Sequence, residues 1–209
     1  MTDADYAQMA RGLLDQRDER RGPIRLFAYG SLIWKPEIAH DRECPALARG
    51  WHRSFCLRIS RFRGTPEVPG LMMALDRGGQ CRGLLLDLPP EDPEGQLDRI
   101  LRRECTVKPT SNMPRWLRVE TDQGPAQALG FVINRASPNY AGRMALAEVA
   151  EVLARACGHW GSGAEYLLNT VGGLEARGIR DGRLWQLQRL VAAAIDRADA
   201  DPLPLPDRS

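Results

Sequence analysis

Residues 26–35 read LFAYGSLIWK, in which a strand-like run is interrupted by a Gly-Ser pair. Residues 26–29 have the apolar character of a buried strand, and this character resumes at residues 32–34. Without a side chain, Gly30 permits a close backbone approach or a positive φ. Consecutive backbone N–H groups in such a turn can bind a carboxylate or an oxyanion, and Ser31 would add a hydroxyl donor. The interruption therefore predicts either a plain β-turn or an anion-binding backbone loop.

The rest of the chain divides into a strand-rich first part and a helical second part. Residues 53–60 (RSFCLRIS) alternate polar and apolar side chains, which is typical of a half-buried strand. The pattern predicts strands at 24–29, 51–60, 70–76, 81–88, 114–121 and 127–134. Helical spacing predicts helices at 3–21, at 94–104 and throughout the region after residue 134. This segregation favours an α+β fold with an antiparallel sheet or barrel over alternating βαβ units.

Apolar stripes at helical spacing identify the sides of the expected helices that face the core. Three stripes follow residue 134: Leu146, Val149, Ala150 and Leu153; Leu167, Leu168, Val171 and Leu174; Leu184, Leu187, Val191 and Ile195. The five tryptophans are expected in the core rather than stacked on a ligand: Trp34, Trp51, Trp116, Trp160 and Trp185. The chain is thus expected to comprise an N-terminal helix and linker (1–22), a main domain (23–198) and a disordered or surface-bound Pro-rich tail (199–209).

The composition is that of an ordinary globular protein. Of 209 residues, 43% are hydrophobic and 27% are charged, and the net charge of +2 gives no indication of a nucleic-acid or membrane partner. The N-terminus is too charged for a signal peptide, and no apolar run is long enough to span a membrane. The five cysteines, an odd number without a C-x-x-C pair, argue against a disulfide framework or structural zinc and for buried or half-buried thiols. We therefore expect a protein of the reducing cytoplasm.

Glu104 is the most informative single residue, because it stands where the pattern calls for an apolar side chain. The apolar face of the expected helix runs through Leu97, Ile100 and Leu101, and position 104 continues this series. A carboxylate that faces the interior must be paired, hydrogen-bonded or protonated. Burial would raise its pKa toward the range that general acid–base catalysis needs. The alternative is a glutamate at the helix end that turns to solvent or pairs with a neighbouring arginine.

The segment RFRGTPE at 61–67 is a second candidate for binding an anion. It carries Arg61, Arg63 and Glu67 around a glycine and a threonine, and an arginine fork suits a carboxylate. An exposed connector with surface charges is the alternative that the sequence leaves open. The histidines are scattered and match neither a zinc-binding spacing nor a Ser-His-Asp triad: His40, His52 and His159.

Several motifs occur together along the chain: FAYGSLIWKPEI, then GWHRSFCLRISRFRGTPEVPG, then the Arg103-Glu104 pair. Together with EYLLNTVGGLEARGIRDGRLWQLQRLVA near the C-terminus, they resemble the ChaC family of γ-glutamylcyclotransferases over about residues 24–195. The combination of YGSLIW with RGTPExPG is much more specific than either motif alone.

The resemblance implies a γ-glutamylcyclotransferase-like fold, a mixed, mainly antiparallel β-barrel with flanking helices. It implies cleavage of glutathione, a small-molecule partner, to 5-oxoproline and cysteinylglycine without a metal or organic cofactor. In this reaction the α-amine of the substrate attacks its own γ-carbonyl carbon, and a glutamate at position 104 would take the proton that the amine must lose. Besides Glu104 as the catalytic residue, the implied substrate-binding residues are Ala28, Tyr29, Gly30, Ser31, Leu32 and Ile33, with Arg63 and Tyr166 as secondary candidates.

One segment departs from the family pattern. Bacterial relatives commonly continue after the catalytic glutamate with Met and a short segment containing Gly and Tyr, whereas this chain reads ECTVKPTSNMPRW. The change beside Glu104 leaves open another γ-glutamyl amide or peptide as the substrate. A third reading is a non-catalytic module for an acidic metabolite, which would still bind its ligand after Glu104→Gln and form no product.

Overall fold

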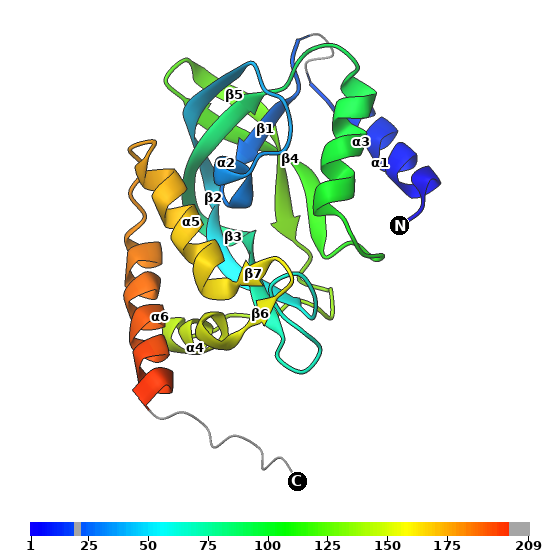
Figure 1. Ribbon diagram of the computed structural model, residues 1–209. Helices are drawn as coiled ribbons and strands as arrows, with labels where there is room; N and C mark the ends of the chain where they lie inside the picture. Colours follow the sequence, from blue (N-terminus) through cyan, green and yellow to red (C-terminus); the bar gives the residue numbers. More distant parts are fainter. Residues whose placement is uncertain (19–21, 201–209) are drawn as a thin grey trace.

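The computed structural model describes residues 1–18 and 22–200 and centres on a closed five-stranded barrel (Figure 1). The strands are β1 (Arg25–Ala28), β2 (Arg42–Ile59), β3 (Gly70–Asp87), β4 (Asn112–Thr121) and β5 (Gly124–Ile133). Their order around the barrel is β1-β3-β2-β4-β5, and β1 pairs with β5 at Leu26 and Leu129. Neighbouring strands are antiparallel apart from the parallel contacts that β1 and β3 make with β5. The predicted α+β fold with a mixed, mainly antiparallel barrel is therefore confirmed.

The barrel is built around two long antiparallel strands, β2 and β3, whose pairing runs from Arg42 opposite Asp87 to Ile59 opposite Gly70. The sequence predicted two strands, 70–76 and 81–88, where β3 is continuous, so that prediction is wrong. Gly78 and Gly79 looked like a break, but they adopt positive φ values of 104° and 68° and form a bulge within the ladder. Strand β2 also begins at residue 42, well before the predicted start at 51.

After β1 the chain enters a short helix, α2 (Ser31–Trp34), rather than a continued strand. Gly30 precedes this helix with φ −139° and ψ −126°, which takes the chain out of the strand direction. Helix α2 packs against α5 (Gly163–Glu175), where the Trp34 indole donates to Thr170 Oγ1 at 3.1 Å. The Gly-Ser pair is thus a strand-to-helix junction at the barrel wall.

Helices α1 (Asp3–Asp15) and α3 (Pro93–Glu104) lie side by side on one flank of the barrel (Figure 1). The Tyr6 hydroxyl of α1 donates to the Cys105 carbonyl at 3.0 Å, just beyond the end of α3. Helix α1 ends short of the predicted residue 21, because no apolar residue follows Leu14 to bury against the barrel. Helix α3 agrees with the predicted 94–104 to within one residue, so Glu104 is its last residue.

The opposite flank carries α4 (Leu146–Arg155), α5, and α6 (Gly182–Ala200), with the two-residue strands β6 (Cys157–Gly158) and β7 (Gly161–Ser162) before α5 (Figure 1). The predicted stripes face the core except at Leu168, which is exposed because it lies a quarter-turn away from Leu167 and Val171. The predicted boundary at 198 falls inside α6, and residues 201–209 of the predicted tail lie outside the described residues. No described helix is long and apolar enough to cross a membrane.

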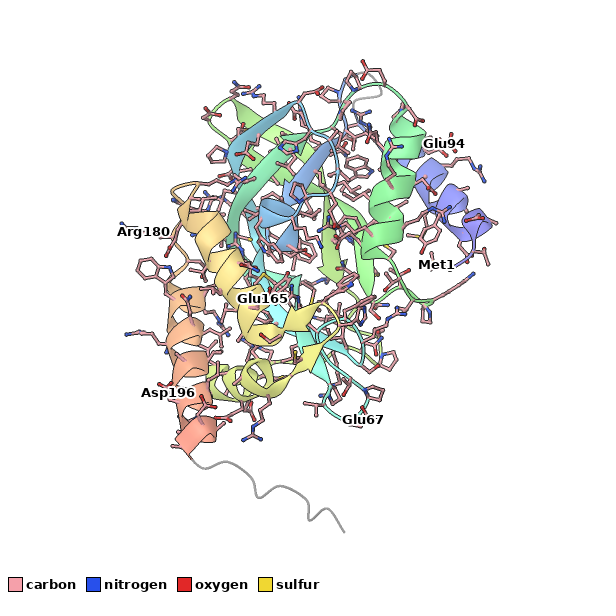
Figure 2. The ribbon with its side chains drawn as sticks, viewed as in Figure 1. Met1, Glu67, Glu94, Glu165, Arg180 and Asp196 are labelled. Atoms are coloured by element: carbon pink, nitrogen blue, oxygen red, sulfur yellow. The ribbon has the colours of Figure 1, made fainter. Side chains whose placement is uncertain are left out.

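Three side chains expected in the core are exposed instead, so those predictions are wrong. Trp160 is 56% exposed and stacks on Phe62 with ring centroids 4.1 Å apart, and Trp185 is 41% exposed. The Arg180 guanidinium lies 5.9 Å from the Trp185 ring centroid, on the outer side of the molecule in Figure 2. Cys157 is also exposed, at the two-residue strand β6. Trp160 and Cys157 lie in a short hairpin, which gives no periodicity from which burial could be predicted, whereas Trp185 lies in α6 outside the buried stripe of that helix.

Candidate active site

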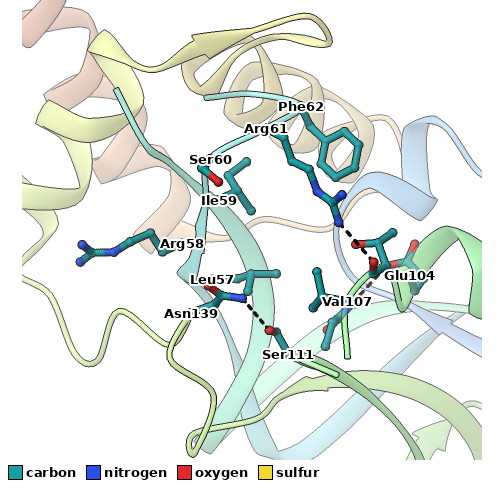
Figure 3. A pocket seen from close by; sticks show the side chains of 12 residues that line it. Leu57, Arg58, Ile59, Ser60, Arg61, Phe62, Glu104, Val107, Ser111 and Asn139 are labelled. Carbon is teal, nitrogen blue, oxygen red and sulfur yellow. Dashed lines mark hydrogen bonds between the residues drawn. The ribbon is translucent and has the colours of Figure 1, made fainter. Parts of the chain in front are cut away.

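Glu104 lines a cavity of about 110 Å³ between the end of α3 and the loop that follows β2 (Figure 3). One wall comes from residues 57–62 and the other from Asn139 and the segment that begins at Glu104 and ends at Asn112. Figure 3 shows Arg61 extending from the first wall toward the Glu104 side, where it donates to the Thr106 carbonyl at 3.2 Å. The helix end that carries Glu104 therefore opens into a space lined by two arginines, of which Arg61 rather than Arg58 points toward Glu104.

Two donors hold the Glu104 carboxylate, which has a side chain only 16% exposed. Arg103 Nε donates to Oε1 at 3.1 Å, and Asn112 Nδ2 donates to Oε2 at 3.2 Å. Burial raises the pKa of Glu104, and the nearby Arg103 charge offsets this effect only in part. The sequence left open an interior carboxylate or a pair with arginine, and both descriptions apply. A raised pKa makes this carboxylate a stronger base than an ordinary glutamate, which suits it to accept a proton.

Arg103 connects the end of α3 to the segment after α2. Its Nη1 donates to the Pro36 carbonyl at 2.5 Å and to Glu37 at 3.1 Å, while Nε holds Glu104. Glu37 has a positive φ of 53°, a conformation that non-glycine residues rarely adopt. The sequence named Arg103 only as part of a motif, and its contact with a segment 67 residues away in the chain could not be read from local spacing.

Asn112 has a buried acceptor that nothing in the described chain satisfies. The residue is 8% exposed, and its amide nitrogen is used by Glu104. Its Oδ1 is the one buried side-chain polar atom without a hydrogen-bond partner among residues 1–18 and 22–200. An unpaired buried acceptor is costly, and this one belongs to a residue of the cavity wall. The position is suited to an N–H or O–H group of a ligand, and sequence analysis missed it.

Tyr166 of α5 meets the Gly30-Ser31 junction directly. The Ser31 backbone N–H donates to the Tyr166 hydroxyl at 3.3 Å, and a β-carbon on Gly30 would lie only 2.9 Å from that hydroxyl. Burial, followed by the Glu104 charge, raises the pKa of Tyr166 to about 12, so the hydroxyl keeps its proton at neutral pH. The Ser31 side chain also hydrogen-bonds this hydroxyl. The Gly30-Ser31 junction and the Tyr166 hydroxyl therefore lie together as a polar cluster near Glu104.

The other predicted loop residues face the core. Ala28, Leu32 and Ile33 are buried among apolar side chains, which leaves only their backbone available to a ligand. The Tyr29 hydroxyl donates to the Phe131 carbonyl at 2.8 Å across the barrel. Burial and then the Glu104 charge raise the Tyr29 pKa well above its usual value. The side chain of Tyr29 is thus a structural donor inside the barrel.

Arg63 and Arg61 occupy different places although both belong to the predicted RFRGTPE segment. Arg63 donates to the Ser162 carbonyl at 2.8 Å and to Glu165 of α5, labelled in Figure 2, at 3.0 Å. Its guanidinium lies 5.5 Å from the Tyr166 ring centroid, so it supports that ring. Arg61, and not Arg63, lines the Glu104 cavity.

The barrel, the Gly-Ser junction and the half-buried glutamate define a γ-glutamyl cyclotransferase type of structure. The fold matches that of a γ-glutamyl cyclotransferase specific to glutathione from yeast with a TM-score of 0.74 and 20% identity, over 83% of this chain and 97% of that one. The family described as ChaC-like protein matches residues 24–194, and the chain belongs to this family. The resemblance inferred from the motifs is therefore confirmed.

Curated relatives agree with this assignment. The chain is 34% identical over 179 residues to the glutathione-specific γ-glutamylcyclotransferase of Escherichia coli (strain K12), an alignment that covers 85% of this chain and 76% of the relative. It is 28% identical to γ-glutamylcyclotransferase 2-3 of Arabidopsis thaliana, over 83% of this chain and 91% of the relative.

Proposed function

We propose that this protein cleaves glutathione to 5-oxoproline and cysteinylglycine, with Glu104 as the general acid–base. The observation that carries the proposal is a half-buried carboxylate with a raised pKa in the wall of a cavity. Membership of the ChaC-like family and the names of the relatives support the reaction and its substrate. The five cysteines are free thiols, which supports a reducing cytoplasmic location.

The proposed reaction is an intramolecular transfer. The neutral α-amine of the substrate attacks the γ-carbonyl carbon and gives one of its two N–H protons to Glu104, which forms the C–N bond of the five-membered lactam. Glu104 then returns the proton to the cysteinyl nitrogen as its bond to the γ-carbon breaks. No water is consumed, because the amine and the leaving nitrogen exchange places on one carbon. Holding the γ-glutamyl chain in a folded conformer would lower the entropic part of the barrier.

Asn112 supplies a second contact for the attacking nitrogen. A neutral amine has two N–H bonds and one lone pair, and the lone pair must point toward the carbonyl carbon. One N–H would face Glu104, and the other would donate to the free Oδ1 of Asn112, beside the Glu104 carboxylate. This arrangement satisfies the orphaned acceptor only when the substrate is bound, so it orients the amine for attack.

The Gly30-Ser31 junction and Tyr166 would hold the negative charge of the γ-glutamyl group. The Tyr166 hydroxyl keeps its proton at neutral pH, and it accepts from the Ser31 backbone N–H at the point where the chain passes from β1 into α2. These donors would bind either the α-carboxylate or the oxyanion that develops on the γ-carbonyl. Arg63 acts here as a positioning residue, because it contacts the Tyr166 ring rather than lining the cavity.

Arg61 is the cation that the cavity offers to the other end of the substrate. Its Nη2 has one carbonyl partner, Thr106, and the guanidinium lies 4.9 Å from the Phe62 ring centroid. We assign to it the glycyl carboxylate of glutathione. The second candidate, another γ-glutamyl compound, follows from the altered segment after Glu104, whose residues Thr106 and Val107 form part of the same wall.

The proposal is tested by measuring glutathione turnover, with 5-oxoproline and cysteinylglycine quantified by mass spectrometry. The comparison is between the native protein, Glu104→Gln, and Glu120→Gln as a control, since Glu120 pairs on the surface with Arg49. Both products from native protein and control, with a large loss in Glu104→Gln, would support the assignment. A folded native protein that forms neither product would refute it, and a panel of γ-glutamyl amides and peptides would then test the second candidate.

A further inference from the structure

A second, larger cleft of about 650 Å³ lies apart from the Glu104 cavity and shares no lining residue with it. Residues 52–55 of β2 and 77–80 of β3 form one side, at the bulge between the two strands. The segment 143–149 before and within α4 and the first turns of α6 form the other side. This volume is in the range of pockets that hold a small organic molecule.

The cleft carries a marked excess of positive charge. Five arginines line it and only one acidic residue, Asp181: the arginines are Arg53, Arg77, Arg135, Arg143 and Arg183. Arg53 pairs with Asp181 at 2.9 Å, and Arg135 pairs with the buried Asp76 at 2.7 Å. The remaining three form no ion pair with any residue that the structure describes. Three exposed guanidinium groups from three different chain segments therefore line one space, and the single carboxylate of that lining is paired with Arg53.

The lining of the cleft is partly apolar, which favours an anion that also has an apolar or aromatic part. Its lining includes aliphatic side chains from the α4 and α6 side, of which Met144 and Leu146 are partly exposed, whereas Leu184 and Leu187 are buried. The glycines of the β3 bulge, Gly78 and Gly79, lie opposite and have no partner on β2 in the ladder. An arginine rim binds phosphate oxygens through its paired N–H groups, and the aliphatic surface can cover an apolar or aromatic body.

We propose that this cleft binds a small organic phosphate of the nucleoside-diphosphate type. The phosphates lie on Arg77, Arg143 and Arg183, and the base and ribose cover the aliphatic side chains. A phosphate without an organic group would contact only the three arginines. The contribution of the arginines can therefore be measured separately from that of the aliphatic side chains.

Arg53 connects this cleft to the active-site junction. It is almost fully buried, and its Nε donates to the Tyr29 carbonyl at 2.6 Å while Nη1 holds Asp181 at 2.9 Å. Tyr29 immediately precedes Gly30, so one guanidinium touches both the cleft and the predicted substrate loop. An anion in the cleft competes with Asp181 for Nη1 and so acts on the residue that holds the Tyr29 carbonyl. Ligand binding is therefore expected to change the KM for glutathione, a consequence that rests on the proposed function.

Calorimetric titration of the full chain with ADP, inorganic pyrophosphate and adenosine tests the site. The cleft variant is Arg77→Gln/Arg143→Gln/Arg183→Gln. The matched control is Arg115→Gln/Arg118→Gln/Arg189→Gln, which removes the same charge from exposed positions outside the cleft. We expect saturable ADP binding that weakens roughly tenfold or more in the cleft variant and less than about twofold in the control. Absence of ADP binding to native protein, or an equal loss in both variants, would overturn the site.

The remaining measurements separate the parts of the proposal. Pyrophosphate is expected to bind more weakly than ADP, and equal affinities would overturn the role of the aliphatic surface. Saturating ADP is expected to change the KM for glutathione by about twofold or more, and an unchanged KM would overturn the connection through Arg53. Because the titration does not depend on turnover, a protein that failed to cleave glutathione would refute the proposed function and leave the result on the cleft intact.

Discussion

The barrel gives two carboxylates, the buried Asp76 and the half-buried Glu104, very different surroundings. Asp76 is 2% exposed and accepts three hydrogen bonds of 3.0 Å or less, from Arg135 Nε, the Arg77 backbone N–H and the Tyr140 hydroxyl. Burial alone would raise the pKa of Asp76, but these donors outweigh it and the pKa is lowered. Glu104 has two donors beyond 3 Å, and burial prevails, so its pKa is raised.

The comparison shows that the number and length of the hydrogen bonds that a carboxylate accepts, rather than its burial, decide whether its pKa is lowered or raised. The lowered pKa of Asp76 means that its ionised form stabilises the folded state above its unfolded pKa, a contribution lost as the pH falls through the folded value. For Glu104 the sign is opposite: the folded state favours the protonated form, and stability decreases as the pH rises through the raised folded pKa. This is the pattern expected of Glu104 under the proposed function, in which its carboxylate exchanges protons at some cost in stability.

The largest effect is expected for Glu104→Gln. Loss of the general acid–base should lower kcat for glutathione cleavage by about 10²- to 10⁴-fold. Because the neutral amide removes the unfavourable ionisation, the thermal midpoint at pH 7 should stay equal to that of the native protein or rise. A scan of thermal unfolding beside the turnover assay checks both. A Tm well below the native value would show that Glu104 is a structural carboxylate like Asp76.

The same exchange at the other carboxylate, Asp76→Asn, should have the opposite result. The amide keeps one acceptor oxygen, but it carries no charge for Arg135 and its NH2 group meets a donor, so the free energy of unfolding should fall by about 1–3 kcal/mol. The kcat per folded molecule should remain within a fewfold of native, since Asp76 does not line the Glu104 cavity. Urea unfolding with an activity measurement at low temperature tests this, and a stable but inactive variant would contradict it.

Asn112→Ala is expected to have a smaller effect, confined to catalysis. The variant loses both the donor to Glu104 and the free acceptor, so kcat should fall by about ten- to a hundredfold. Removing the donor to the ionised carboxylate should also move the acid limb of the pH–rate profile to higher pH. Asn139→Ala is the matched control, because this amide lines the same cavity and bonds Ser111 rather than Glu104. An acid limb that shifts equally in both variants would contradict the role of Asn112.

How far the sequence predicts these features depends on how local their signals are. Glu104 could be identified because it interrupts the apolar series of a single helix, and the Gly-Ser junction because it interrupts a single strand. The stripes of α4, α5 and α6 and the α+β class follow from the same short-range periodicity. β3 was divided in error because a glycine pair signals a turn locally, whereas only the pairing with β2 turns it into a bulge.

Asp76 and Asn112 could not be predicted because their partners are distant in the chain. Asp76 depends on Arg135 and Tyr140, which are 59 and 64 residues away. Asn112 stands at the start of a strand, where a polar residue is unremarkable, and its free acceptor is defined only once the cavity wall has formed. The arginines of the second cleft likewise come from separate segments that only the closed barrel brings together.

The smallest effect is expected for Arg103→Gln, which tests whether the Arg103 charge lowers the pKa of Glu104. Arg103 lowers the pKa of Glu104 against the effect of burial, so its removal should move the acid limb of the kcat/KM profile to higher pH. The loss at the high-pH plateau should stay within about tenfold, since the base itself remains. Arg102→Gln is the matched control, because the adjacent Arg102 holds Asp98 and Asp3 and does not contact Glu104. If the limb stayed in place in Arg103→Gln, or moved as far in Arg102→Gln, the proton acceptor would have to be a group other than Glu104.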